Sequence, residues 1–496
     1  KDMVRGSTGA NHIPPVADTL EELDRQIEEA KLHDAGTGII TGDPEEPLYG
    51  RCYLPRKFKI AVTVPGDNSM DIFIHDIALV VIMDEDGKTL RGYNVMVGGG
   101  MGRTHNKEST FARVNEMIGY VPKEDITEAL KAILATQRDH GNRQVRANAR
   151  LKYLVHTLGI DNFRTLVEKY FGKSFQAAVP LPEWHAVDWL GWHPQGDGNW
   201  FVGINVEQGR VKDEGDFKLK TVLRKIVDKY QCDLRLTANQ NIVVCGIKSA
   251  DKADVQQLLS SHGIKDIAEI DAMTRKSIAC PAFPLCGLAQ SEAERSMPAF
   301  NARINALLDK IGLPGESFVF RMTGCPNGCA RPYMAEFALV GMGAEQYQVW
   351  MGGSPNQDGR TGWRWKDRVK AAALEETLEP ILFMWKTQRT SKAERFGDFT
   401  NRVGADAIDA YIAQYKPGTA FENVVVEELE PVTRTVTTKG TTTKPRGTAD
   451  RLTSGPRKQQ VRVTEELHGM LKAKAEADGV HISDLVEQLL VHGIKM

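Results

Sequence analysis

The sequence predicts an α+β fold that contains two copies of one α+β unit. The first copy shows the apolar run Ile77–Val81 and then Tyr93–Gly99, and the second shows Phe337–Gly341 and then Tyr347–Gly353. Each copy ends in glycines, where the backbone can closely approach a bound group or another chain segment. The alternative explanation is chance similarity between β-rich segments. The two copies therefore predict two similar halves around one site.

The elements of the first copy follow from its apolar runs and its turn residues. Helical periodicity covers residues 122–172, with breaks at Pro122, Gly141 and Gly159. Upstream of the copy, one further helix is expected at Thr19–Leu32, with Asp18 or Thr19 as its cap. The expected strands, separated by D-N, D-G and G-G-G, are Lys59–Val64, Ile77–Met83 and Tyr93–Val97.

Between the two copies, the pattern indicates a strand, a helix, a hairpin and a second helix. This order is part of a ferredoxin-like α+β unit. The expected elements are the strand Trp200–Val206, the helix Leu219–Tyr230, the hairpin strands Leu234–Thr237 and Ile242–Cys245, and the helix Lys252–His262.

The predicted organisation has six segments. In chain order they are an N-terminal helical and linker segment (1–47), the first α+β copy (48–178), a ferredoxin-like half-domain (179–265), the second α+β copy with the clustered cysteines (266–415), a basic disordered linker (416–457) and a small C-terminal module (458–496).

Composition limits the class of protein. Of the 496 residues, 26% are charged and 41% are hydrophobic, and the net charge of −2 gives no global attraction to nucleic acid or membrane. The longest apolar run, near Ile77–Met83, is far shorter than a membrane span. Seven cysteines fit metal ligation in a soluble, reducing compartment better than a secreted disulfide framework.

Four of the cysteines form two close pairs. Cys280 and Cys286 lie in A-C-P-A-F-P-L-C-G, and Cys325 and Cys329 lie in T-G-C-P-N-G-C-A-R-P. Zinc knuckles favour shorter and more regular spacing, whereas iron–sulfur clusters tolerate spacing of this kind. The sequence therefore predicts an iron–sulfur centre, against the alternative of four separate core cysteines. The other three, Cys52, Cys232 and Cys245, are expected to be small core residues.

A basic segment, Leu54-Pro55-Arg56-Lys57-Phe58-Lys59, precedes the first expected strand. In the register of the repeat, it would lie where the second copy has Gly324–Cys329, so a basic loop would face a cysteine loop. Strand alternation would place Lys57 and Lys59 on one face, with Arg56 and Phe58 on the other. The alternative is a solvated run of charges on an edge strand.

These motifs resemble those of a known family. The cysteine motifs, together with Y-L-P-R-K-F-K at 53–59, V-G-G-G-M-G-R-T-H at 97–105, T-Q-R at 136–138, T-A-N-Q-N at 237–241 and G-D-F-T-N-R at 397–402, resemble the sirohaem and [4Fe-4S] site of sulfite and nitrite reductases. The resemblance covers about residues 45–405. It is nearest to the ferredoxin-dependent sulfite reductases of plants, algae and cyanobacteria.

The resemblance implies a function and roles for individual residues. The implied reaction is the six-electron reduction of sulfite to sulfide, with ferredoxin as electron donor, in a plastid stroma or a cyanobacterial-type cytoplasm. Lys57 and Lys59 would bind sulfite and help to deliver protons. The implied [4Fe-4S] ligands are Cys280, Cys286, Cys325 and Cys329, of which Cys329 would also be the axial ligand of sirohaem; Arg56 would meet the sirohaem carboxylates, and Asn327, Gly98, Gly99 and Gly100 would neighbour sirohaem.

Two residues of the second cysteine motif bear on the choice of substrate. In the family, nitrite enzymes commonly carry Ser or Thr at the position of Gly328 and Gln at the position of Arg331. Gly328 and Arg331 therefore favour sulfite, and nitrite reduction is the alternative.

The family also has a further N-terminal stretch with another ferredoxin-like half and several arginines that hold sirohaem and sulfite. The first residue is Lys1, and this chain has two copies of the repeat but one half-domain. The sequence is therefore expected to be a fragment whose pocket lacks one wall. Alone, it is expected to bind sirohaem poorly.

The C-terminal module resembles a ribbon-helix-helix unit. Residues 458–464 alternate, two helices divided at Gly479 follow, and Gln460, Arg462 and Thr464 would point outward. In such folds paired strands enter the DNA major groove. The sequence thus suggests two hypotheses, DNA binding through 431–496 and homodimerisation through 458–496. The alternative function is that of a DNA-associated protein.

Overall fold

A computed structural model describes residues 39–418 except positions 42, 44, 45, 51, 187, 357 and 358. The chain divides into two compact units, 1–430 and 431–496. The predicted helix Thr19–Leu32 and the ribbon-helix-helix-like module lie outside the described residues, as does the linker beyond residue 418.

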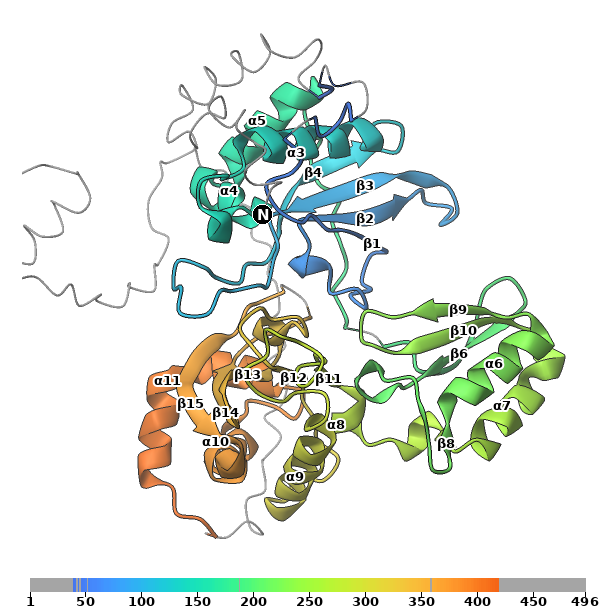
Figure 1. The fold of residues 1–496 in the computed structure, drawn as a ribbon, viewed down its shortest axis with the longest axis vertical. Coiled ribbons are helices and arrows are strands. Elements are labelled where there is room, and N and C mark those ends of the chain that lie inside the picture. The colour runs from blue at the N-terminus through green and yellow to red at the C-terminus, as the bar shows by residue number, and fades with distance from the viewer. Residues whose placement is uncertain are drawn as a thin grey trace, which may run out of the picture. The chain divides into compact units, whose positions relative to one another are not determined.

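The first α+β copy is a four-stranded sheet with helices on one face (Figure 1). Only β1 and β2 run parallel, and each later strand is antiparallel to its neighbour. Apolar residues of β2 and β3 pack with those of the helices in one buried core. The elements are β1 (Ile60–Thr63), β2 (Ile77–Met83), β3 (Leu90–Val97), β4 (Glu116–Pro122), α3 (Ile126–His140), α4 (Leu151–Leu158) and α5 (Ile160–Phe171).

The half-domain between the copies is an antiparallel sheet whose strand order is β5-β6-β10-β9. Val222 and Ile226 of its first helix share a buried core with Val202 and Val244 of the sheet. The elements are β5 (Gly191–Pro194), β6 (Trp200–Ile204), α6 (Leu219–Tyr230), β9 (Asp233–Leu236), β10 (Ile242–Ile247) and α7 (Lys252–Ser261). The expected strand–helix–hairpin–helix order is confirmed.

The second copy is a five-stranded sheet in the order β11 to β15. Its first three strands are parallel, and the rest are antiparallel. The elements are α8 (Ala272–Arg275), β11 (Ser277–Ala279), α9 (Met297–Lys310), β12 (Phe320–Thr323), β13 (Phe337–Gly343), β14 (Gln346–Met351), β15 (Trp363–Lys370), α10 (Leu374–Gln388) and α11 (Phe396–Gln414).

The two copies correspond from β1 in the first and β12 in the second, while β11 has no counterpart in the first sheet. The parallel pair β1 and β2 matches β12 and β13, and each pair is joined through a short 3₁₀ helix, Ile72–Ile74 or Pro332–Met334. Each of these short helices is preceded by a residue with positive φ, Asp71 or Arg331. The structure thus supports the internal repeat.

The register expected for the basic segment was wrong. Because β1 corresponds to β12, the loop after β1 occupies the place of Gly324–Cys329 in the second copy. Leu54–Lys59 instead precedes β1, as residues 314–319 precede β12. In the sequence, the connection between the two apolar runs is shorter in the second copy than in the first, so the alignment of the segments before these runs was ambiguous.

The two copies share a buried core. Ala78 and Val80 of β2 belong to the same buried cluster as Ala338 and Val340 of β13. Alternate residues of β2, Ile77 and Leu79, belong to the core with the helices. A strand buried on both faces reads as a continuous apolar run, which explains the unbroken pattern of Ile77–Met83.

The buried His140 predicts a specific acid sensitivity. Burial lowers the pKa of His140 from 6.5 to about 4, and its Nε2 lies 2.9 Å from the Tyr170 hydroxyl. The unfolded chain therefore binds more protons below pH 6.5, so stability should fall as pH falls from 6.5 to 4. His140→Gln should remove about 2–3 kcal/mol of this fall, measured by urea unfolding of the chain at both pH values. An unchanged pH dependence would contradict the assignment.

Among the described residues, the structure contains no helix that is long and apolar enough to cross a membrane.

Candidate active site

The four clustered cysteines follow neighbouring strands of the second copy. Cys280 comes directly after β11, and Cys325 and Cys329 lie in the loop after β12. Since β11 and β12 are parallel, their carboxyl ends meet at one edge of the sheet. The N–H of Gly324 donates to Cys280 Sγ at 3.2 Å, which ties the two cysteine motifs together. Amide donors of this kind stabilise thiolate sulfur and tune bound clusters.

The electrostatics of the thiols also place them close together. Burial raises the pKa of Cys280 to about 11, and the neighbouring Cys329 and Cys325 act in the same direction. Burial likewise raises the pKa of Cys325, with further contributions from Cys329 and Cys286. Cys280 and Cys325 would therefore lose their protons readily only to a metal centre. The Gly324–Cys280 hydrogen bond joins the two cysteine motifs, and ligation of one cluster by all four cysteines stays a prediction.

The arrangement suits a cluster better than a single ion. Among the described residues, no group of three or more His, Cys, Asp or Glu side chains converges as single-ion ligands. An iron–sulfur cluster is larger than a single ion and takes thiolate ligands that lie further apart. The donor set therefore fits the predicted [4Fe-4S] group.

The glycine-rich loop of the first copy meets the cysteine loop of the second. The N–H of Arg103 donates to Pro326 O at 3.1 Å. A Cβ on Gly102 would lie 3.4 Å from Asn327 O. The guanidinium of Arg103 covers the rings of Tyr333 and Trp350, with centroid distances of 5.9 and 5.0 Å. The glycine-rich loop of one copy thus contacts the cysteine loop of the other, and a site shared by the two halves stays a prediction.

Packing accounts for the glycines expected near sirohaem. Gly98 has φ +85, and a Cβ there would lie 2.5 Å from Arg113 Nη1. A Cβ on Gly99 would lie 2.5 Å from Phe73 O, and one on Gly100 would lie 3.1 Å from Lys152 Cδ. Gly98 and Gly99 are therefore needed for the fold itself, whereas a Cβ on Gly100 would meet only movable side chains such as that of Lys152. Their contact with sirohaem stays a prediction.

The basic segment differs from the expected strand. Residues 55 and 56 form a bend and residues 57–59 lie outside any strand, whereas the strand expected at Lys59–Val64 is present as β1. The alternation nevertheless holds, since Lys57 and Lys59 are exposed while Arg56 and Phe58 are half-buried. Phe58 packs against the core of the first copy, which turns the two lysines outward.

Lys59 lies within electrostatic reach of Cys329. Loss of hydration lowers the pKa of Lys59, as do the charges of Arg150 and Lys57, while Asp76 and Cys329 oppose the change. The N–H of Lys59 donates to Asp76 Oδ2 at 3.0 Å. Lys59 and Arg150 thus both contact the buried Asp76, and a cluster of cations of this kind suits an anionic substrate.

Several residues of this site were missed in the sequence. Asp76 is fully buried and pairs with Arg150 at 2.7 Å, and the Arg150 Nε has no partner among the described residues. That free N–H is suited to an anionic group such as a cofactor carboxylate. Lys152 donates to the carbonyls of Gly100 at 3.2 Å and Gly102 at 2.8 Å and to Phe111 O, and burial lowers its pKa to about 7. In the sequence, the motif A-R-L-K-Y at 149–153 contains both Arg150 and Lys152 and was the feature that could have indicated them.

The cysteines outside the two motifs divide into two groups. Cys232 and Cys245 are each 6% exposed, so their assignment to the core is confirmed. Cys52 is exposed, and its expected burial was wrong. It follows a turn that lies outside any strand, where alternation gives no information about burial.

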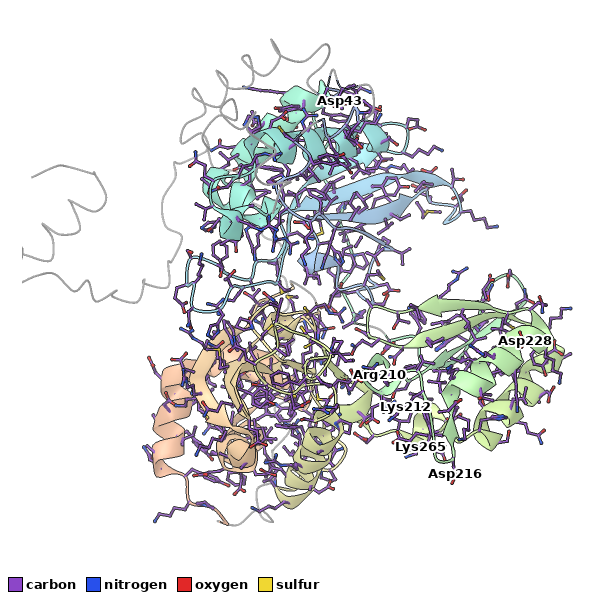
Figure 2. The ribbon with its side chains drawn as sticks, in the orientation of Figure 1. Asp43, Arg210, Lys212, Asp216, Asp228 and Lys265 are labelled. Atoms are coloured by element: carbon purple, nitrogen blue, oxygen red, sulfur yellow. The ribbon has the colours of Figure 1, made fainter. Side chains whose placement is uncertain are left out.

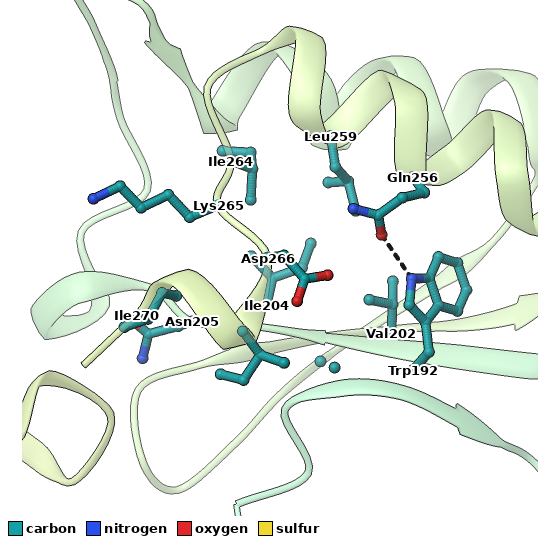
Figure 3. A pocket seen from close by; sticks show the side chains of 13 residues that line it. Trp192, Val202, Ile204, Asn205, Gln256, Leu259, Ile264, Lys265, Asp266 and Ile270 are labelled. Atoms are coloured by element: carbon teal, nitrogen blue, oxygen red, sulfur yellow. Dashed lines mark hydrogen bonds between the residues drawn. The ribbon is translucent and has the colours of Figure 1, made fainter. Parts of the chain in front are cut away.

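The half-domain lines two hollows, and the larger one also includes Ser69 and Met70 of the first copy. One, between β6 and α7, has a cavity volume of about 20 Å³, and the Trp192 indole donates to Gln256 Oε1 across its rim (Figure 3). It is large enough for about one water molecule. A second, of about 640 Å³, is lined by apolar and polar residues that include Trp189, Phe201 and Leu236.

The surface of the half-domain carries exposed charges of both signs, including the labelled Arg210, Lys212, Asp216, Asp228 and Lys265 (Figure 2). This mixture does not identify a docking surface for an acidic electron donor.

Comparison with known proteins identifies the family. The family described as "Nitrite and sulphite reductase 4Fe-4S domain" matches residues 15–175 and 271–417. The chain belongs to this family. A second description, "Nitrite/Sulfite reductase ferredoxin-like half domain", matches residues 193–262 between them. The predicted cofactors, sirohaem and a [4Fe-4S] cluster, are those of the family, and this prediction is confirmed.

Individual relatives agree with this assignment. The chain is 46% identical over 443 residues to "Sulfite reductase [ferredoxin]" of Synechococcus elongatus, which covers 89% of this chain and 65% of that protein. It is 43% identical to "Sulfite reductase [NADPH] hemoprotein beta-component" of Staphylococcus saprophyticus, over 80% of this chain and 67% of that one. The chain thus spans about two thirds of the length of these relatives.

Among solved structures, the Mycobacterium tuberculosis NirA protein shares the fold. The TM-score is 0.61 at 24% identity, over 80% of this chain and 70% of that one. The predicted α+β class is confirmed. DNA binding and homodimerisation, predicted for residues outside the described part, find no support among these proteins.

Proposed function

We propose that this chain is the sirohaem- and [4Fe-4S]-binding part of an assimilatory sulfite reductase. The observation that carries the proposal is the hydrogen bond from the Gly324 N–H to Cys280 Sγ at 3.2 Å, which joins the two cysteine motifs at one edge of the sheet. The relatives named as sulfite reductases support the reaction. When bound, the cluster would relay electrons from the external donor, and sirohaem would supply the iron at which sulfite is reduced.

Each part of the site then has a chemical task. Cys280, Cys286, Cys325 and Cys329 would hold the cluster, and Cys329 would also bind the sirohaem iron. Lys57 and Lys59 would attract the sulfite dianion, and their ammonium groups could donate protons to it. Arg56 and the free N–H of Arg150 would bind cofactor carboxylates.

Ferredoxin is the proposed electron donor. The support is the relative named "Sulfite reductase [ferredoxin]". Since that relative is cyanobacterial, we propose a reducing, cytoplasm-type compartment for this protein.

The shape of the cysteine loop favours sulfite over nitrite. Gly328 has φ +67, and a Cβ there would lie 2.8 Å from Tyr333 Cε2. A serine or threonine, common at this position in nitrite enzymes, would therefore require the loop to shift. Nitrite reduction is the alternative that the experiment must separate.

The experiment supplies the chain with iron, sulfide, sirohaem and a chemically reduced electron donor. Sirohaem occupancy is first measured by absorbance, because the chain alone is expected to bind sirohaem poorly. Sulfide release from sulfite and ammonia release from nitrite are then compared per occupied site. We expect sulfide with the higher kcat/KM. Occupied sites that release ammonia but no sulfide would contradict the proposal.

A further inference from the structure

One arginine joins three parts of the chain beside the cysteine loop. The Arg331 guanidinium donates from Nη1 to Ala238 O at 2.7 Å and from Nη2 to Asn239 Oδ1 at 2.8 Å, both in the half-domain hairpin. Its Nε lies 2.7 Å from Asp71 Oδ2 in the first copy. Arg331 itself follows Cys329 by two residues. Movement of the cysteine loop would disturb all three contacts.

Asp71 and Arg331 occupy equivalent positions in the two copies. Each has a left-handed backbone and immediately precedes a short 3₁₀ helix. Since the charges are opposite, the two equivalent positions attract each other directly. Identical charged residues at both positions would repel.

Asp71 and Arg331 are both buried, so water can do little to solvate either charge if its partner is removed. Asp71 is 2% exposed, Arg331 9% and Arg321 4%. Arg321 supports the contact, since its Nη1 lies 2.8 Å from Asp71 Oδ2 and donates to Arg331 O at 3.2 Å. Removing the carboxylate would leave two buried guanidinium groups without their shared counter-charge, which is strongly unfavourable.

The segment that begins at Asp71 ends at a second buried carboxylate, Asp76. Asp71 contacts the cysteine loop through Arg331, while Asp76 accepts from the N–H of Lys59 and pairs with Arg150. The residues between them include the 3₁₀ helix Ile72–Ile74, whose side chains are all buried. A short rigid segment therefore connects the cysteine loop to the cations.

We propose that Asp71 and Arg331 are positioning residues that fix the Cys325–Cys329 loop against the Asp71–Asp76 segment, and so set the spacing between Cys329 and Lys59. The importance of that spacing rests on the proposed function. The anchoring itself can be tested without turnover.

The test measures thiol alkylation in the cofactor-free full chain by mass spectrometry. Cys325 is 8% exposed, so its labelling by iodoacetamide reports opening of the loop. Asp71→Asn should increase the labelling rate of Cys325 about tenfold or more, because the loop loses its anchor. Cys245, which is buried in the half-domain, should label at an unchanged rate and serves as the internal reference.

Glu336→Gln is the matched control. Glu336 is a buried carboxylate in the second copy that pairs with Arg395. Among the described residues, its side chain has no ion pair with Arg331, so it is not linked to the Cys325–Cys329 loop in the way that Asp71 is. Its loss should change Cys325 labelling less than about twofold. An unchanged rate in Asp71→Asn, or an equal increase in both variants, would overturn the proposal.

Two further variants test the anchoring if Asp71→Asn destabilises the whole chain rather than the loop alone. If Cys245 labelling also rises in Asp71→Asn, the loop is tested with Asp71→Glu, which keeps the charge and should give a smaller increase at Cys325 alone. Asp71→Asn combined with Arg331→Gln removes both charges, and should restore part of the slow labelling. A double variant that labels faster than Asp71→Asn would contradict a role for the charge pair.

Discussion

Replacing Cys329 with serine is expected to abolish stable binding of the iron–sulfur cluster and the thiolate link to sirohaem. Cys329 lies in the loop after β12, within electrostatic reach of Cys280, Cys325 and Lys59. A serine hydroxyl is a harder and less acidic ligand than a thiol, so one cluster ligand and the proposed axial ligand are lost together. Non-haem iron per chain should fall roughly tenfold or more after desalting.

Cys245→Ser is the matched control for this change. Cys245 is also a free cysteine, and it is buried in the half-domain away from the cysteine motifs. It should retain the iron content of the unmodified chain. A Cys329→Ser chain that keeps its full iron content and sulfite turnover would show that the axial assignment is wrong.

Replacing Lys59 with methionine is expected to lower kcat/KM for sulfite about 100-fold. Methionine keeps much of the apolar stem of Lys59 but removes its ammonium group. The pKa of Lys59 is lowered below its usual 10.5, first by loss of hydration and then by Arg150 and Lys57. If the protonated form binds sulfite, turnover should fall as pH rises through this lowered pKa. The Lys59→Met variant should lack that alkaline fall.

Lys88→Met provides the comparison, since Lys88 is an exposed lysine in the turn between β2 and β3. It should leave kcat/KM and its pH profile within about twofold of the original, as surface substitutions usually do. Equal effects of Lys59→Met and Lys88→Met would argue for general electrostatic attraction of sulfite rather than a specific site.

The sequence predicted the elements whose burial pattern is regular. The strand at Ile77–Met83 and the helix at Leu219–Tyr230 have the expected bounds, because one is apolar throughout and the other is strongly amphipathic. The strand β4, within the first copy, was not predicted. It contains Gly119 and ends in Pro122, two residues that weaken a strand pattern although neighbouring strands bury it.

The candidate site was predicted to the extent that its chemistry lies in local motifs. The four cysteines and the two lysines are close in sequence to distinctive glycines and prolines. Asp71, Asp76 and Arg150 could not be assigned from the sequence, because their roles come from contacts between distant segments. An isolated Asp or Arg is usually exposed, and only the fold shows that these are buried and paired.

The most direct test of the central claim is the iron and acid-labile sulfide content of the anaerobically reconstituted chain, with an electron paramagnetic resonance spectrum of the reduced form. Four cysteines around one cluster predict about four iron and four sulfide ions per chain and the signal of a reduced [4Fe-4S] centre. A chain that binds one metal ion without sulfide, or that binds none while remaining folded, would contradict the assignment.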